Sequence, residues 1–479
     1  MGLERRGEIM YIRESYIDDL LRHKDHDYIK VVTGIRRCGK STLLVQYQDR
    51  LQMLGVPKER IITLNFEDYE NEAYKNPKEL HKFILEQIDI ENNYYIFLDE
   101  IQMVSEFEHV LASLNLRKNL DIYITGSNAY LLSGELATFL SGRYVELLVF
   151  PLSFKEFFDY LGGDSRKVFE EYINRGGFPY AVSIEDTKTF KDYIHGVMNT
   201  VIVKDIMGRK KITDSLLLES IAKFLFSNVG SLVNIKKISD YLISNNRKTT
   251  SPTVETYVKG LMEALTIYRV DRYDIWGKKY LQMNSKYYVA DLAIRKAYLN
   301  QRRPDVGHGL ENIVFIELKR RGYEVYVGSI QGLEVDFIAE KSDDKVYIQV
   351  SQSVMLDEVF ERETRSLLKI DDHYPKLLLT LDEICGADHG ILHINLIDWL
   401  IDDSNIVKTY QKADFVVKEA KTTTYNVDKE VERYKENAKL LLKEKLAEFE
   451  KATLEGDTWE ATEAWKTIVG VQEFLKLKK

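Results

Sequence analysis

The stretch Gly34-Ile35-Arg36-Arg37-Cys38-Gly39-Lys40-Ser41-Thr42 decides the fold of this chain. It follows the apolar run Tyr28–Thr33 and opens a helical pattern, the setting in which GxxxxGK[ST] folds as a phosphate-binding loop. Glycines let backbone N–H groups turn inward around phosphate, and the helix N-terminus adds partial positive charge. We predict that residues 34–42 bind ATP, with Lys40 on the β- and γ-phosphates and Ser41 on Mg²⁺.

Short apolar runs alternate with amphipathic stretches through the first 150 residues. Apolar runs flanked by helical patterns are typical of strands buried on both sides of a parallel sheet. The predicted strands are Tyr28–Thr33, Ile61–Phe66, Tyr94–Leu98, Asp121–Thr125 and Tyr144–Val149. The predicted helices are Ser41–Leu54, Pro77–Ile90, Ser105–Leu116 and Ala129–Leu140. The sequence therefore predicts an α/β fold of the P-loop NTPase kind, with helices on both faces of a parallel sheet.

Two acids end the third of these strands, in Tyr95-Ile96-Phe97-Leu98-Asp99-Glu100. Because ligands of parallel α/β sheets bind at the carboxyl ends of the strands, these acids are expected beside the phosphates. We predict that Asp99 holds Mg²⁺ together with Ser41, and that Glu100 is a catalytic residue that polarises the attacking water. A carboxylate at this place favours hydrolysis over binding alone.

Polar residues near the next two strands are further candidates. In Ile124-Thr125-Gly126-Ser127-Asn128, the residues Thr125, Ser127 or Asn128 could contact the γ-phosphate or orient the water. We place Ser127 with Lys40 in the catalytic set; a helix N-cap is the alternative role for Ser127 or Asn128. Arg143 is a candidate arginine finger, acting within one chain or from a neighbouring copy. A solvated arginine at a strand end is the alternative.

These motifs together resemble those of a known family. The runs GIRRCGKSTLL, LNFED, FLDEIQ, ITGSNA, SGRY, PLSFKEF and GGFP are similar to those of bacterial and archaeal AAA-type ATPases with an uncharacterised, nuclease-like C-terminal domain. The resemblance extends from about Tyr11 to Leu400. It implies an AAA-type sheet, an ATPase cycle and a position for Arg143 near a nucleotide. It implies no particular physiological substrate.

Helical periodicity replaces the strands after Pro151. Two helices, Ile235–Ser244 and Pro252–Ala264, are then followed by two strands, Ile267–Tyr273 and Lys279–Ser285. Helix, turn, helix and β-ribbon is the order of a winged helix, which the sequence predicts here.

The predicted winged helix is basic, although the whole chain is acidic. Residues 231–300 hold 12 Lys+Arg and 6 Asp+Glu, against a formal charge of −9 for the chain. Clustered cations are the footprint of contact with a phosphate backbone. Candidate DNA contacts are Arg247, Lys248, Lys278 and Lys279. Binding of a protein partner is the alternative for this region.

A smaller αβ domain is predicted near the C-terminus. Glu311, the strand Glu334-Val335-Asp336 and the strand Tyr347–Val350 resemble a restriction-endonuclease core. In that core an Asp on one strand and an acid on the next bind Mg²⁺, and a lysine follows the second acid by two residues. In this sequence Gln349 and Ser351 stand at the positions of the second acid and the lysine. Gln is a poor ligand for a hard cation, and Ser supplies no ammonium. We expect a nuclease-like fold that has lost its chemistry.

The length of 479 residues predicts about three domains. We place an AAA-type ATPase domain at 1–150, a helical region at 151–230, a winged helix at 231–300, a degenerate nuclease-like domain at 301–402, and an amphipathic helical tail at 415–479. The tail has apolar residues at helical spacing from Val431 to Phe449. That seam indicates contact with a protein partner, self-association, or packing against its own chain.

The composition indicates the cellular compartment in which we expect the protein to work. Two cysteines, Cys38 and Cys385, lie far apart, which excludes a disulfide scaffold and fits a reducing cytoplasm. No apolar run reaches the roughly 18 residues of a membrane helix, so no membrane partner is expected. The N-terminal stretch also contains acidic residues, which is not typical of a signal peptide, so none is expected here.

The sequence predicts a Mg²⁺-dependent ATPase whose cycle drives a conformational change. Two outputs stay open. In one, the protein acts on DNA through the winged helix. In the other, it is a nucleotide-gated switch that binds a protein partner, without DNA or nuclease activity.

Overall fold

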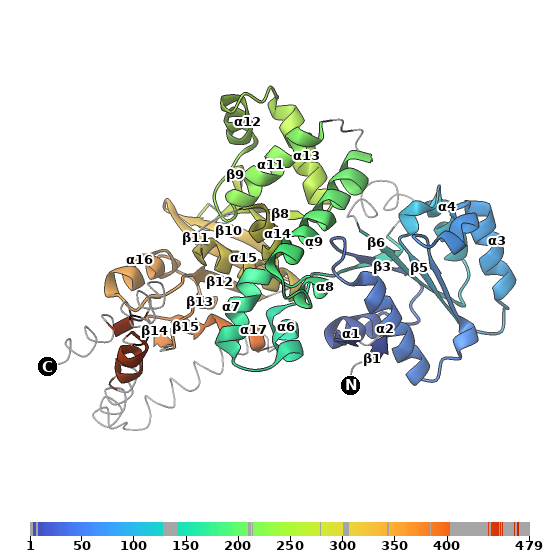
Figure 1. The fold of residues 1–479 in the computed structure, drawn as a ribbon, viewed down its shortest axis with the longest axis horizontal. Coiled ribbons are helices and arrows are strands. Elements are labelled where there is room, and N and C mark those ends of the chain that lie inside the picture. The colour runs from blue at the N-terminus through green and yellow to red at the C-terminus, as the bar shows by residue number, and fades with distance from the viewer. Residues whose placement is uncertain are drawn as a thin grey trace. The chain divides into compact units, whose positions relative to one another are not determined.

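The computed structural model describes residues 3–5, 8–127, 142–208, 212, 214–277, 279–299, 306–342, 344–383, 385–402, 439, 442–449, 451, 453, 464 and 467–468. The chain divides into two units, Met1–Asp343 and Asp344–Lys479, which Figure 1 colours along the chain from blue to red. The boundary falls inside the segment 301–402 that the sequence predicts as one domain.

A five-stranded sheet organises the first part of the first unit, in the order β4-β5-β6-β3-β7. Its strands are β3 (Ile29–Thr33), β4 (Ile61–Asn65), β5 (Tyr94–Asp99), β6 (Leu120–Gly126) and β7 (Tyr144–Leu148). Every neighbouring pair is parallel. Strands β3, β5 and β6 are buried at every residue, as expected for central strands covered on both faces. The predicted parallel α/β sheet is confirmed.

Helices cover both faces of this sheet (Figure 1). They are α1 (Glu14–Arg22), α2 (Lys40–Met53), α3 (Pro77–Gln87) and α4 (Phe107–Leu114), with short turns η1 (Lys58–Arg60), η2 (Tyr69–Lys75) and η3 (Ile101–Met103). Helices α1 and α2 pack together, as do α3 and α4. Local chemistry starts α3, because Pro77 stands at its first turn and Asn76 Oδ1 accepts the N–H of Lys78 at 2.9 Å. The predicted helix Ala129–Leu140 lies outside the described residues.

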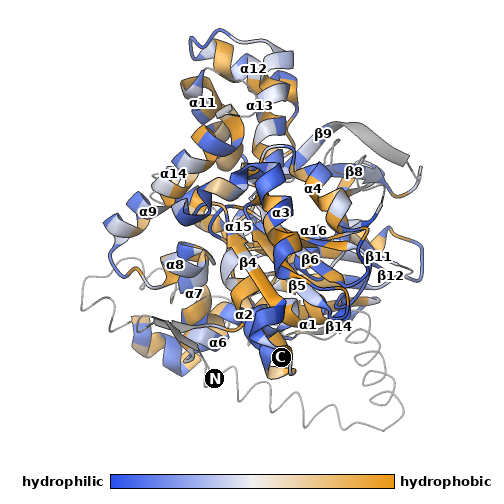
Figure 2. Ribbon diagram, turned by 90° about the vertical axis from the view of Figure 1, so that its right-hand side faces the viewer, coloured by the Kyte–Doolittle hydropathy of each residue, from blue (hydrophilic) through white to orange (hydrophobic). Residues whose placement is uncertain are grey.

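The hydrophobic core on one face of the sheet joins apolar side chains of the strands with those of α3 and α4. Ile96 and Ile122 of the central strands are buried with Ile84 of α3 and Leu111 of α4. Each such side chain contributes about 1.5–3 kcal/mol on burial. Figure 2 shows this hydrophobic colouring along the strands, with hydrophilic residues on the outer sides of the helices. The sheet is thereby rigid enough to hold loops at its carboxyl edge.

The middle of the chain is helical, as predicted. Its elements are α6 (Phe154–Leu161), α7 (Ser165–Arg175), α8 (Pro179–Val182), α9 (Thr187–Thr200), the π-helix η5 (Val201–Met207) and α11 (Ser215–Ser227). Helix α6 begins at a capping box, in which Ser153 Oγ accepts the N–H of Glu156 at 3.0 Å. Seven residues directly after α9 adopt π geometry, a rare conformation often found at functional sites.

The run Gly176-Gly177-Phe178-Pro179 forms a tight clamp on Asp291. The carboxylate of Asp291 accepts the N–H of Gly177 at 2.6 Å and that of Ala293 at 2.8 Å. Gly176 has φ +69°, and a Cβ there would lie 1.8 Å from Asp291 Oδ1. Only glycine therefore fits at this position. Burial raises the pKa of Asp291 to about 7, although the two backbone hydrogen bonds act to lower it.

The helices and strands predicted for the winged helix are all present. They are α12 (Ile235–Ser244), α13 (Ser251–Glu263), β8 (Ile267–Asp274) and β9 (Lys279–Val289), and β8 pairs with β9 in an antiparallel hairpin. One feature was not predicted: β8 also pairs in parallel with β10 (Glu324–Ile330). The ribbon is therefore part of a larger sheet instead of a free hairpin.

The first unit ends with α14 (Leu292–Tyr298), α15 (Val306–Arg320), β10 and β11 (Leu333–Lys341). Strands β10 and β11 are antiparallel. Gly322 follows α15 with φ +81°, the left-handed conformation expected after a helix. The N-terminal pair β1 (Leu3–Arg5) and β2 (Glu8–Met10) is also antiparallel.

The second unit contains β12 (Asp344–Val350), α16 (Asp357–Leu368), β13 (Lys376–Thr380), β14 (Gly386–Asp388), β15 (Ile391–Asn395) and α17 (Leu396–Ile401). Strand β13 pairs in parallel with both β12 and β15. Of the predicted tail, residues 442–449 are helical, and most of the rest lies outside the described residues. None of the described helices is long and apolar enough to span a bilayer.

Candidate functional site

The loop between β3 and α2 folds as a cradle because of its backbone. Gly34, Arg37 and Gly39 all have positive φ, at +154°, +67° and +102°. A Cβ at Gly34 would lie 2.2 Å from the carbonyl oxygen of Val149, so the loop packs closely against the residue after β7. Successive amides in such conformations form an anion-binding nest. The residues of the loop thus fit a phosphate chain.

Lys40 turns its ammonium into this loop. The side chain is buried, and Nζ donates to the carbonyl oxygens of Gly34 at 2.9 Å and Ile35 at 3.3 Å. Ser41 is exposed and Thr42 is half-buried at the first turn of α2. The loop therefore combines a fixed cation, a helix N-terminus and an accessible hydroxyl, the donor set that a triphosphate and its Mg²⁺ require.

The two acids lie at the carboxyl end of β5, separated from β3 by the single strand β6. Both are nearly buried. Thr125 Oγ1, on β6, donates to Asp99 Oδ1 and accepts the backbone N–H of Glu100, the latter at 2.8 Å. This hydroxyl is therefore occupied in holding the acids, and it is not free to act as the γ-phosphate sensor that the sequence allowed for Thr125.

Glu100 is the acid with the perturbed environment. Its backbone is in the left-handed region with φ +55°, which is unusual for a residue other than glycine. Burial raises the pKa of its carboxyl, while the nearby Lys40 and Arg36 act to lower it. Its Oε2 accepts a hydrogen bond from Gln102 Nε2. A carboxylate with a raised pKa near the phosphate loop is suited to accept a proton.

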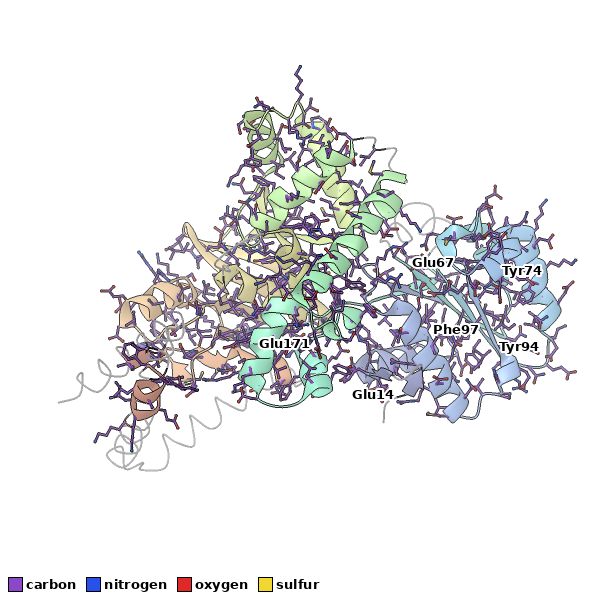
Figure 3. The ribbon with its side chains drawn as sticks, in the orientation of Figure 1. Glu14, Glu67, Tyr74, Tyr94, Phe97 and Glu171 are labelled. Carbon is purple, nitrogen blue, oxygen red and sulfur yellow. The ribbon has the colours of Figure 1, made fainter. Side chains whose placement is uncertain are left out.

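Ser127 lies at the end of β6 beside an acid that the sequence did not single out. Ser127 Oγ donates to Asp205 Oδ1 at 3.4 Å, and Asp205 belongs to the π-helix η5. Arg36 of the phosphate loop pairs with the same carboxylate, with Nε 3.2 Å from Oδ2, and with Glu67 through Nη1 at 2.9 Å. Figure 3 shows Glu67 at the end of the sheet away from Tyr94, which begins β5. Asn128 lies outside the described residues.

Arg13 is a second residue that sequence reasoning missed. Its buried guanidinium forms an ion pair with Glu156 at 2.8 Å and donates to the carbonyl oxygens of Phe150 at 2.8 Å and Cys38 at 3.3 Å. The pKa of Arg13 is raised, because the attraction of Glu156 outweighs the opposing effect of burial. This one side chain joins the phosphate loop to the segment after β7. No local motif marks Arg13, since its partners are distant in sequence.

Arg143 is not brought to the phosphate loop of its own chain. It directly precedes β7, its carbonyl accepts the N–H of Ile29 at 3.0 Å, and its side chain is exposed. Strands β7 and β3 are parallel, so Arg143 lies at the edge of the sheet where β3 begins. The length of β3, about 15 Å, separates it from the loop. An arginine finger within one chain is therefore wrong, and a role from a neighbouring copy stays a prediction.

The described candidate DNA contacts lie in the turn between α12 and α13 and at the start of β9. Lys248 is exposed and Arg247 half-buried in the turn between α12 and α13. Lys279 begins β9 opposite Asp274, and Lys278 lies outside the described residues. The turn before α13 thus presents cations to solvent. Contact between these cations and the phosphate backbone of DNA stays a prediction.

The acids of the predicted nuclease-like core surround a lysine. Lys286 Nζ of β9 lies 3.0 Å from Glu311, 2.8 Å from Glu334 and 3.7 Å from Asp336, and its side chain is only 3% exposed. These carboxylates raise the pKa of Lys286 despite its burial. In the part of the chain that the structure describes, no group of His, Cys, Asp and Glu side chains is arranged to hold a metal ion. In the second unit, Gln349 Nε2 donates to Glu363 at 3.2 Å.

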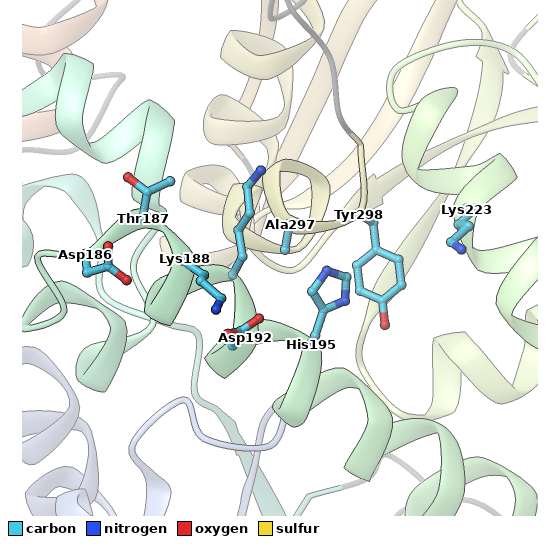
Figure 4. A pocket seen from close by; sticks show the side chains of 9 residues that line it. Asp186, Thr187, Lys188, Asp192, His195, Lys223, Ala297 and Tyr298 are labelled. Atoms are coloured by element: carbon cyan, nitrogen blue, oxygen red, sulfur yellow. The ribbon is translucent and has the colours of Figure 1, made fainter.

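A separate cavity of about 690 Å³ lies among α9, α11 and α14 (Figure 4). Its lining includes Lys188, Lys191 and Lys223 but also Asp186 and Asp192, and Lys223 pairs with Glu219 at 2.8 Å. The ring of His195 lies 4.7 Å from that of Tyr298. Because acids and lysines compensate one another here, we assign no ligand to this cavity.

Comparisons with known proteins agree with the geometry of the loop and sheet. Residues 26–158 match the family model of an AAA domain, and residues 166–305 match a domain of unknown function. An uncharacterised protein of Haemophilus influenzae is 42% identical over 403 residues, which are 82% of this chain and 100% of that protein. The chain belongs to the same family as this protein.

The family extends to archaea. An uncharacterised protein of Methanocaldococcus jannaschii is 30% identical over 380 residues, covering 74% of this chain and 82% of that protein. Among solved structures, the Walker-type ATPase of Pyrococcus abyssi matches with a TM-score of 0.43 and 17% identity, over 62% of this chain and 98% of that one. The match of residues 26–158 to the AAA-domain model, together with the parallel sheet, shows that the chain carries an AAA-type P-loop domain, as the sequence predicts. The winged helix and the nuclease-like core stay predictions.

Proposed function

We infer that this protein binds Mg²⁺·ATP at residues 34–42 and hydrolyses it, and that the cycle changes the conformation of the helical middle. One observation carries the proposal. Thr125, on the strand between the loop strand and the acid strand, holds both Asp99 and the backbone of Glu100. Because the Asp99 carboxylate and the Glu100 backbone are fixed at the edge of the sheet that carries the phosphate loop, this contact supports hydrolysis over binding alone.

Each residue has a distinct task in this proposal. The amides of the loop and the Lys40 ammonium bind the phosphate chain, while Ser41 and Asp99 would hold Mg²⁺. A bound Mg²⁺ would neutralise charge on the phosphates as the bond breaks. Glu100 orients a water molecule and accepts its proton, for which the raised pKa of its carboxyl is suitable. In the proposal, Ser127 and Arg36 contact the terminal phosphate, which is supported by their shared contact with Asp205 next to the phosphate loop.

Lys40→Ala tests the binding step, because it removes the cation at the centre of the loop. We expect loss of ATP binding by at least about a hundredfold in calorimetry, since interactions of this kind with phosphate are charge-assisted. Lys58→Ala, on an exposed lysine of the same domain, is the matched control. Equal affinity of Lys40→Ala and the wild type would remove the basis of the proposal.

Action on DNA is a second part of the proposal. The net positive charge of residues 231–300 and the exposed Lys248 support contact with a phosphate backbone. ATPase rates with and without duplex or forked DNA at low salt test this. Stimulation that is lost in the double variant Arg247→Ala, Lys248→Ala supports it. A rate that DNA leaves unchanged favours the alternative, a nucleotide-gated switch with a protein partner.

A further inference from the structure

Asp205 joins the π-helix to the phosphate site. Its carboxylate is buried, and both oxygens are engaged by groups from the nucleotide domain. Oδ2 lies 3.2 Å from Arg36 Nε, and Oδ1 lies 3.4 Å from both Arg36 Nη2 and Ser127 Oγ. Asp205 is 169 positions from Arg36 and 78 from Ser127 in the sequence, yet it contacts both residues, which flank the expected place of the terminal phosphate.

The two partners of Asp205 are those that a γ-phosphate would also seek. Arg36 is a cation within the phosphate loop, and Ser127 follows β6 on the strand next to the acids. A carboxylate and a phosphate oxygen accept the same hydrogen bonds from a guanidinium and a hydroxyl. They also repel each other in a site of low dielectric. ATP and Asp205 therefore compete for the same donors, whereas ADP lacks the phosphate that would compete.

Ile206, the residue after Asp205, connects η5 to α13. Ile206 is fully buried, and its Cγ2 lies close against Gly260 of α13, where a Cβ would come within 2.8 Å. Helix η5 also packs against α9 and α11. A shift of η5 on release of Asp205 would therefore press directly on α13, the second helix of the predicted winged helix. The π conformation, which costs stability relative to an α-helix, is a suitable element for two discrete arrangements.

We propose, resting on the function proposed above, that Asp205 is a positioning residue that senses the γ-phosphate. In the empty and ADP-bound protein it holds Arg36 and Ser127. ATP takes over both donors, releases Asp205, and frees η5 to move against α13. This assigns to the π-helix the step by which nucleotide state reaches the helical middle.

Hydrogen exchange of residues 201–207 in the full-length wild type tests the proposal without any variant. We expect exchange severalfold faster with a non-hydrolysable ATP analogue than with ADP, and equal rates with ADP and without nucleotide. If both nucleotides bind but exchange is the same with each, this inference falls and the proposed function stands. If neither nucleotide binds, both fall.

Asp205→Asn keeps the shape of the side chain and removes its charge. We expect the Kd for the ATP analogue to fall by about five- to tenfold while that for ADP changes less than twofold, and exchange of 201–207 to be fast without nucleotide. Glu67→Gln is the matched control, because Glu67 is the other carboxylate that pairs with Arg36, at 2.9 Å from Nη1, and it is not part of η5. It should leave exchange of 201–207 in the nucleotide-free protein at the wild-type level. An unchanged ratio of ATP to ADP affinity in Asp205→Asn would overturn the proposal.

Discussion

Thr125 Oγ1 accepts the backbone N–H of Glu100 at 2.8 Å. The same hydroxyl donates its proton to Asp99, so one fully buried side chain of β6 fixes two consecutive residues of the neighbouring strand. This contact holds Glu100 in its left-handed backbone conformation, in which it leaves the line of β5. The direction of the carboxylate that we propose as catalytic therefore depends on a residue that itself need not touch the substrate.

Thr125→Val tests this positioning role. Valine has nearly the shape of threonine but leaves the Glu100 N–H and the Asp99 carboxylate without their partner. We expect a loss of about 1–3 kcal/mol of stability, the usual cost of an unsatisfied buried polar group. Turnover should fall about tenfold or more while ATP binding is retained, as steady-state kinetics would show. Thr63→Val, on the exposed face of β4, is the control, and equal turnover in both variants would contradict the role of Thr125.

Glu100→Gln should separate binding from chemistry. We expect ATP binding close to that of the wild type and a turnover at least about a hundredfold lower, as for the loss of a general base. Because burial raises the pKa of Glu100, the stability that its neutral form provides is lost as pH rises through that pKa. Glutamine does not ionise, so the variant buries no charge at pH 8. Its melting temperature at that pH should therefore be a few degrees higher than that of the wild type. This advantage should shrink at acidic pH. Wild-type turnover in Glu100→Gln would show that another group activates the water.

Arg143→Ala should affect turnover only where copies of the chain associate, since Arg143 cannot reach its own phosphate loop. Mixing provides the test. Arg143→Ala retains an intact loop and Lys40→Ala retains the arginine, so a mixture of the two inactive proteins should regain part of the wild-type rate. If Arg143→Ala alone hydrolyses ATP at the wild-type rate, the residue is a solvated arginine at a strand end.

Asp291 should make the stability of the first unit depend on pH near neutrality. Its pKa is about 7 in the folded chain against an ordinary value of 3.8, so it favours the protonated form. Its contribution is fully present below pH 3.8 and is lost as pH rises toward 7. Asp291→Asn should thus be less stable than the wild type at pH 5, by a margin that shrinks by about 2 kcal/mol or more at pH 8. Denaturant unfolding at both pH values measures this, and a constant margin would contradict it.

The parallel sheet, the phosphate loop and the acid pair could be predicted because their signals are local. The spacing of Gly34, Gly39 and Lys40 specifies a backbone path, and an apolar run such as Tyr94–Leu98 specifies a buried strand. For the sheet itself, the sequence left the order of the strands undetermined, since several strand orders are compatible with the same alternation of strands and helices. The sequence made the hydroxyl of Thr125 a candidate for contact with the γ-phosphate, because Thr125 ends the predicted strand Asp121–Thr125. Its partners became visible only in the structure, where β5 lies beside β6.

The sequence by itself determined the chemistry that this protein can attempt, because glycine conformations, a lysine and two carboxylates are properties of neighbouring residues. Only the tertiary structure decided which side chains that are distant in sequence contact one another. Arg13, Asp205 and Lys286 each act on partners at least 25 positions away, and no periodicity or motif connects such residues. The same holds for Arg143, which a motif placed near the nucleotide and the direction of β7 places at the opposite edge. Charged side chains in a folded chain pair with groups that are close in space. Which groups are close is decided only when the helices pack against the sheets.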